Sequence, residues 1–131
     1  MMSRPFAPQF SEEEFHALVK EALDSLPDFF REKLSNVEVL VADWPTPAEV
    51  RAAGARSRCE LLGLYQGIPL THRTGNYTMV LPDKITIYRM PIERICRSRR
   101  AIVRQVRRTV LHELAHHFGI SDDRLRELGA Y

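Results

Sequence analysis

The sequence predicts an α+β fold built as a single domain. Apolar residues repeat every three or four positions after residue 11. A longer helical pattern of the same kind runs from about Pro91 to Phe118, with a candidate break near Arg97 to Arg99. Several short β-branched runs lie between these two patterns and indicate strands. The chain has 131 residues, of which 44% are hydrophobic, and this suits one modest core. We therefore expect an N-terminal arm over residues 1–10 and one domain over residues 11–131.

The first helix is expected from Ser11 to Leu26. Ser11 is a good N-cap, and three glutamates follow it in the first turn, where the helix dipole favours negative charge. One face of this helix is apolar, and its members are Phe15, Leu18, Val19, Ala22, Leu23 and Leu26. Pro27 ends the helix, and the following segment DFFREKLS predicts a second, short helix.

Short apolar runs predict a small sheet of three to four strands. The runs are VEVLVAD (37–43), LLGLYQG (61–67) and KITIYR (84–89), with YTMV (77–80) as a further candidate. They are rich in β-branched and aromatic residues, which strands favour. The segment PTPAEVRAAGARSR (45–58) carries prolines and a glycine, so it predicts a surface connection with one helical turn.

Charge and composition argue against nucleic acid and against a membrane. The formal net charge is only +2, too small to indicate an anionic partner. The segment RICRSRRAIVRQVRR is rich in arginine, but four of its arginines share a helix face that we interpret as solvated: Arg97, Arg100, Arg104 and Arg107. The start of the chain lacks the apolar core of a signal peptide, and no run is long enough to cross a bilayer. We therefore expect a cytoplasmic protein with no nucleic-acid partner.

The two cysteines are Cys59 and Cys96, and neither has a C-x-x-C partner. We expect both to be reduced thiols, because disulfides are rare in the cytoplasm.

Residues that commonly bind metals gather in TVLHELAHHFGISDD (109–123), at the end of the long helical pattern. At about 100° per residue, His116 falls roughly 40° from His112, one turn further along the same face. Neutral imidazole is a preferred ligand of zinc, and a catalytic zinc site combines three protein ligands with one open position. The spacing therefore predicts that His112 and His116 are two ligands of a zinc ion, Zn²⁺.

Glu113 lies beside this pair of histidines. Its carboxylate is placed to act as a general base that takes a proton from a zinc-activated water and delivers it to the leaving amine. His117 instead falls in line with Val110 and Leu114, on the face expected to pack on the sheet. We interpret His117 as a structural histidine in or near the core.

The third ligand must come from beyond the helix. Gly119 follows the helical pattern and can adopt the positive φ that turns the chain back on itself. Asp122 and Asp123 come next, and either carboxylate could return to the metal. Alternatively, Asp122 caps a last helix, DDRLRELGA. The spacing leaves these alternatives open.

The stretch HELAHHFGISDDRL resembles the H-E-x-x-H-x-x-G-x-x-D signature of a family of minimal bacterial zincin-like metallopeptidases, small relatives of the metzincins. LLGLYQGIPLTHR and LPDKITIYRMPIE are also similar to that family, so the resemblance covers residues 61–128. It implies a mixed sheet packed against the motif helix, and we expect the N-terminal helix to pack against this sheet as well. It also implies zinc at His112, His116 and Asp122, with Glu113 as the catalytic base. Larger metzincins have a histidine at the position of Asp122 and a later methionine turn, which this chain lacks.

These features predict a zinc-dependent metallopeptidase acting on peptide or protein substrates. Arg108 lies on the ligand side of the helix and is a candidate for binding a substrate carboxylate or carbonyl. Tyr65 is a candidate for polarising a carbonyl, and so are three residues that follow it: His72, Arg73 and Tyr77.

Two other functions are consistent with parts of the sequence. One is a non-catalytic metal-binding or protein-interaction module. The other is a metal-dependent ribonuclease, because an RNA-processing family has a similar H-x-x-x-H-x-x-G-x-x-H helix. That family does not place a glutamate at the position of Glu113, so the sequence favours peptide hydrolysis.

Overall fold

The computed structural model describes residues 7–67 and 82–129. Its helices are α1 (Glu12–Asp24), α2 (Asp28–Leu34), α3 (Pro47–Ala53), α4 (Arg89–Ile95), α5 (Arg99–Phe118) and α6 (Asp122–Glu127), and its strands are β1 (Val37–Ala42), β2 (Gly63–Gln66) and β3 (Asp83–Tyr88). The predicted α+β class is confirmed. The candidate strand at 77–80 lies outside the described residues, as do His72, Arg73 and Tyr77.

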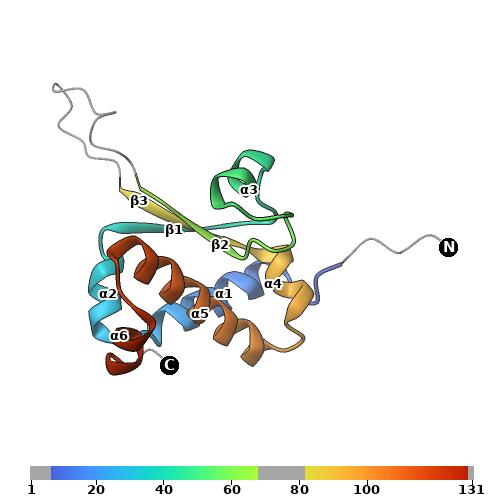
Figure 1. Cartoon of the computed structure of the whole chain (residues 1–131). Helices are drawn as coiled ribbons and strands as arrows, with labels where there is room; N and C mark the ends of the chain where they lie inside the picture. Colours follow the sequence, from blue (N-terminus) through green and yellow to red (C-terminus); the bar gives the residue numbers. More distant parts are fainter. Residues whose placement is uncertain (1–6, 68–81, 130–131) are drawn as a thin grey trace, which may run out of the picture.

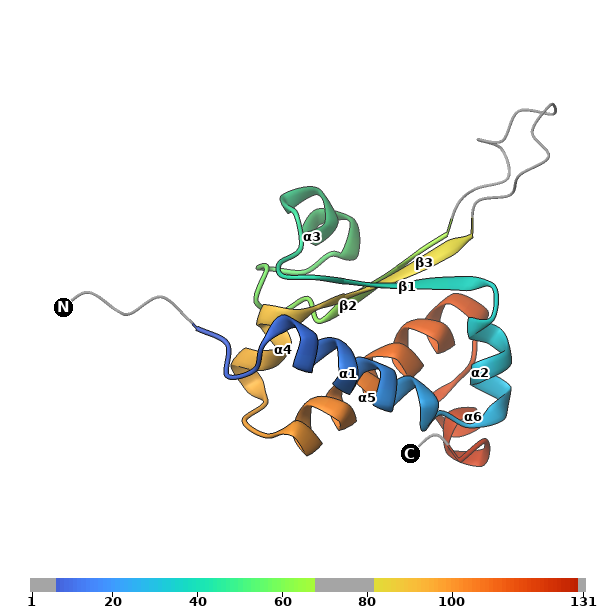
Figure 2. The ribbon, with the colours of Figure 1, turned by 180° about the vertical axis from the view of Figure 1, so that it is seen from behind.

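The three strands form one mixed sheet in the order β1-β3-β2. β1 pairs with β3 in parallel, and β2 pairs with β3 in antiparallel orientation. β2 is therefore an edge strand. Figure 1 shows α3 on one face of the sheet and α1 and α5 on the other, and Figure 2 shows the same layers from behind.

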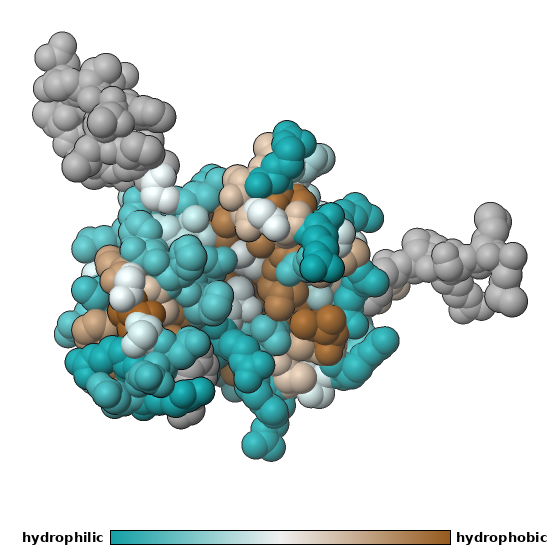
Figure 3. All heavy atoms as spheres, viewed as in Figure 1, coloured by the Kyte–Doolittle hydropathy of each residue, from teal (hydrophilic) through white to brown (hydrophobic). Residues whose placement is uncertain are grey.

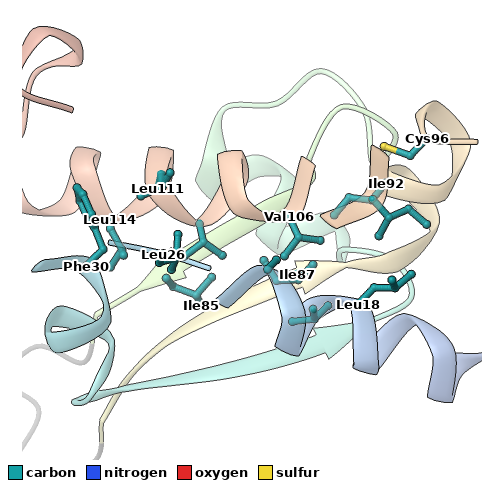
Figure 4. Packing of buried hydrophobic residues seen from close by; sticks show 14 of the residues in the cluster. Leu18, Leu26, Phe30, Ile85, Ile87, Ile92, Cys96, Val106, Leu111 and Leu114 are labelled. Atoms are coloured by element: carbon teal, nitrogen blue, oxygen red, sulfur yellow. The ribbon is translucent and has the colours of Figure 1, made fainter. Parts of the chain in front are cut away.

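The core lies between the sheet, α1 and α5. β3 contributes Ile85 and Ile87, which are fully buried against these helices (Figure 4). The motif helix α5 contributes a line of fully buried residues at helical spacing, namely Ile102, Val106, Val110 and Leu114. The apolar face predicted for the first helix is also buried at Phe15, Leu18, Val19 and Ala22. This packing turns the opposite side of α5 away from the core.

Local signals start and end most helices where the sequence predicts. Ser11 and Glu14 form a capping box at the start of α1. The predicted break near residues 97–99 is confirmed, because α4 ends at Ile95 and α5 begins at Arg99 behind the N-cap Ser98. Gly119 has a φ of 67° and caps the C-terminus of α5 in the left-handed conformation.

The connection between β1 and β2 is more helical than predicted. Thr46 and Glu49 form a capping box, and Pro47 occupies the first helical position, so residues 47–53 form the helix α3. Its position over the sheet brings it close to the motif residues described below.

A buried ion pair fastens the end of the predicted N-terminal arm to α4. Glu93 is 1% exposed, and its Oε1 accepts the backbone N–H groups of Gln9 (2.9 Å) and Phe10 (3.1 Å). Arg89 donates from Nε to Glu93 Oε2 (3.0 Å) and from Nη2 to the Phe10 carbonyl oxygen (2.6 Å).

None of the helices in the described part of the chain combines the length and apolar character needed to cross a bilayer.

Candidate active site

α5 presents His112, Glu113 and His116 to a pocket beside the edge strand. The pocket has a volume of about 390 Å³, and Leu61, Leu64 and Tyr65 line it from the side of β2, with Ala52 of α3 opposite. Both imidazoles are exposed to solvent, whereas Glu113 is partly buried. The structure therefore brings together the two predicted histidine ligands and the predicted base.

The environment of Glu113 favours a carboxyl group that can hold a proton. Burial raises its pKa above the ordinary value, while the imidazoles of His112 and His116 and the backbone N–H of Tyr65 lower it by smaller amounts. The net effect is a raised pKa. A carboxylate whose pKa moves toward neutrality is a better proton acceptor, which suits a general base.

His117 lies outside the core, and the prediction that it is a structural core histidine is wrong. Its side chain is 39% exposed, and its Nε2 lies 3.8 Å from Asp83 Oδ2. Its ring stacks on Tyr65, with 3.9 Å between the ring centroids. The physical reason is the strand order: β2 is the edge strand beside α5, so the His117 ring lies against Tyr65 at the rim of the sheet and not among the core residues.

Tyr65 and Arg108, the predicted substrate-binding residues, have different surroundings. The Tyr65 hydroxyl donates to Asp83 Oδ2 (2.7 Å), and burial together with this carboxylate raises the pKa of Tyr65. That hydroxyl is therefore already engaged. Arg108 is exposed and lines a second pocket that also includes His112 and Glu113.

Comparison with known families identifies the chain. The model of a family described as zincin-like metallopeptidase matches residues 34–130, well over half of the sequence. The chain belongs to this zincin-like metallopeptidase family. The resemblance inferred from the motif is thus confirmed, and the three-stranded mixed sheet beside the motif helix is consistent with a zincin-like fold. No curated protein matches the chain.

The side chains that could bind zinc in this zincin-like protein supply two of the three expected ligands. Two exposed imidazoles one turn apart on a rigid helix are suitable ligands. However, residues 7–67 and 82–129 contain no group of three His, Cys, Asp or Glu side chains placed to hold a metal ion. Asp122 lies exposed in the first turn of α6. Ser121, not Asp122, caps this helix, because its Oγ accepts the Arg124 backbone N–H (3.2 Å).

Sequence reasoning missed Tyr88, which lies on the face of the sheet opposite Ile85 and Ile87. Tyr88 is fully buried, and its hydroxyl has no hydrogen-bond partner among the described residues. Burial, with the carboxylates of Glu49 and Glu113 nearby, raises its pKa. The strand alternation of KITIY could have placed Tyr88 away from the core isoleucines, but only the position of α3 shows that it is covered.

Proposed function

We propose that this zincin-like protein is a zinc-dependent metallopeptidase that hydrolyses peptide bonds in peptide or protein substrates. Family membership supports a metallopeptidase. The observation that carries the proposal is that His112, Glu113 and His116 line one pocket at the edge of the sheet.

In this proposal His112 and His116 hold the zinc ion. Asp122 is the proposed third ligand, and only the spacing of the motif supports this choice. Zinc, when bound, acts as a Lewis acid that polarises the peptide carbonyl and makes water more acidic. To reach the histidines, Asp122 has to leave the place that α6 gives it in the structure.

Glu113 holds and moves the proton. Its carboxylate takes a proton from the attacking water and passes it to the nitrogen of the leaving amine, so that the peptide C–N bond breaks with balanced charge. Partial burial and the backbone N–H of Tyr65 keep this carboxylate in one place beside both histidines. A fixed base is required because proton transfer needs hydrogen-bond contact with the reacting water.

Replacement of Glu113 by glutamine tests this role. Zinc content, measured by elemental mass spectrometry, is expected to match wild type, while cleavage of a mixed peptide library falls by about 100- to 10,000-fold. Glu38→Gln, on the exposed side of β1, is a matched control with unchanged cleavage. Equal cleavage by wild type and Glu113→Gln would exclude Glu113 as the base.

A second candidate function is a non-catalytic metal-binding or protein-interaction module. The observation that favours it is the absence of a three-ligand group within residues 7–67 and 82–129. Wild-type protein that takes up no zinc and cleaves no peptide after incubation with zinc would support this second candidate.

A further inference from the structure

A groove runs along α5 from the candidate active site toward α4. The pocket next to the active site shares His112 and Glu113 with it and is also lined by Glu60, Leu61, Leu62, Gly63, Gln105, Arg108 and Thr109. A third pocket shares Gln105 and Arg108 with the second and adds Ile95, Cys96, Ala101 and Arg104. Shared lining residues make the three pockets continuous. We call the second of them the middle pocket.

The middle pocket has mainly apolar walls. Leu61 is 8% exposed, and Gly63 and Thr109 are also buried. Figure 3 shows apolar surface gathered below α3, with hydrophilic surface on both sides of it. The volume of the middle pocket is about 260 Å³, slightly below the roughly 300–1,000 Å³ of pockets for drug-sized ligands. It therefore suits a short piece of peptide rather than a large cofactor.

Arg108 supplies a cation at this pocket. Among the described residues its guanidinium has no hydrogen bond and no ion pair. Its neighbour Arg107, by contrast, donates to the hydroxyl of Ser25 (3.0 Å). The acid in the same wall, Glu60, instead accepts the backbone N–H of Arg56 (3.1 Å). Arg108 is thus available to an external anion.

A second arginine strengthens the positive charge at this end of the groove. Arg104 lies one turn before Arg108, and both line the third pocket. An arginine binds a carboxylate through two parallel N–H···O bonds, which makes it selective for that group.

The spacing along the helix sets where such a carboxylate would be in a substrate. Arg108 precedes His112 by four residues, which is about 6 Å at 1.5 Å per residue. An extended peptide advances about 3.3 Å per residue. A carboxylate about two residues from the scissile bond would therefore reach Arg108 while the bond lies beside Glu113.

We propose that the middle pocket binds a carboxylate of the peptide substrate, with Arg108 as the specificity-determining residue and the apolar walls holding the intervening aliphatic part. This inference rests on the proposed peptidase function. The carboxylate belongs either to an Asp or Glu side chain or to the C-terminus of the peptide, and both present the same chemistry to Arg108.

Four internally quenched peptide mixtures test the proposal. Each has Glu or Gln at one fixed position, and the residues on both sides of it are randomised among all amino acids except Asp and Glu. Each mixture ends in either a free acid or an amide. Zinc-loaded wild type is expected to cleave the mixtures that contain the recognised carboxylate, whether in the Glu side chain or at the C-terminus, at least tenfold faster, as kcat/KM, than the Gln amide mixture. A Glu-to-Gln difference identifies a side chain, and an acid-to-amide difference identifies the C-terminus. Arg108→Gln is expected to bring the ratio close to one, and Arg100→Gln, exposed on the same helix, to keep it.

Binding separates this inference from the proposed function. Fluorescence anisotropy with the same four mixtures, made with the fluorophore but without the quencher, and Glu113→Gln protein measures affinity without turnover. The inference is supported if the carboxylate mixtures bind more tightly than the Gln amide mixture and if this preference is lost in the double variant Glu113→Gln/Arg108→Gln. This holds even if wild type cleaves no peptide, because the lack of cleavage would contradict only the peptidase function. Equal binding of all four mixtures, or a carboxylate preference that survives in the double variant, overturns it.

Discussion

Thr109 of α5 packs directly on Gly63 of β2. A Cβ atom at residue 63 would lie 2.7 Å from Thr109 Cγ2 and 3.2 Å from the Thr86 carbonyl oxygen, so only glycine fits without movement. Thr109 and Glu113 are four residues apart on one helix face, and Gly63 and Tyr65 are two apart on one strand. The contact between Thr109 and Gly63 therefore helps to set how the Glu113 carboxylate meets the backbone N–H of Tyr65.

Substitution of Gly63 by alanine is expected to push β2 away from α5. Overpacking of this kind costs about 1–3 kcal/mol in the free energy of unfolding, which urea denaturation measures. Gly67→Ala is the matched control, because its nearest neighbours would be 3.6 Å from the added Cβ, an ordinary contact. An equal effect of the two substitutions would show that the sheet edge moves freely relative to α5.

Zinc content distinguishes the ligands. We expect His112→Ala and His116→Ala to lose bound zinc, because each removes one of two imidazoles from a site that needs three protein ligands. The motif spacing predicts the same loss for Asp122→Ala but not for its neighbour Asp123→Ala, with elemental mass spectrometry as the measurement. If Asp122→Ala keeps its zinc, Asp122 is not a ligand.

The raised pKa of Glu113 predicts a pH-dependent stability difference in protein freed of metal by a chelator. A carboxyl group whose pKa is higher in the folded state stabilises the fold when protonated, and this contribution is lost as the pH rises through the folded pKa. Glu113→Gln cannot ionise. Its unfolding free energy relative to wild type is therefore expected to increase from about pH 4 to pH 7. Thermal unfolding of both proteins at a series of pH values measures this difference. If the difference in unfolding free energy between Glu113→Gln and wild type is the same at every pH, burial does not raise the pKa of this carboxyl group.

Glu93 is expected to be the most sensitive polar position outside the candidate active site. Its side chain is fully buried, and Glu93→Gln replaces one acceptor oxygen by an NH₂ group. The substitution also removes the buried charge partner of Arg89 and leaves it the more exposed Asp43, whose Oδ1 lies 3.6 Å from Arg89 Nη1. Breaking a buried ion pair costs about 3–5 kcal/mol. Chemical denaturation measures this loss, and proteolysis near residues 9–10 is expected to increase as the arm is released. Glu12→Gln, on the exposed first turn of α1, should stay within about 0.5 kcal/mol of wild type. A similarly small change in the unfolding free energy of Glu93→Gln would contradict the importance of the buried Arg89–Glu93 ion pair.

The sequence alone determined the features that depend on neighbouring residues. The capping box at Ser11, the break before Arg99 and the left-handed Gly119 are all local, because a cap or turn involves backbone groups only a few residues away. The shared helix face of His112 and His116 belongs to the same class, since helical periodicity fixes it.

Only the tertiary structure decided how distant segments meet. The strand order, which makes β2 the edge strand beside α5, places Tyr65 against His117 and leaves that histidine exposed, although helical periodicity alone puts it on the core face. The burial of Tyr88 and the position of Asp122 on α6 likewise depend on where α3 and α6 pack. These contacts join residues far apart in the chain. Their free energy comes from burial and close packing across layers, which no local pattern specifies.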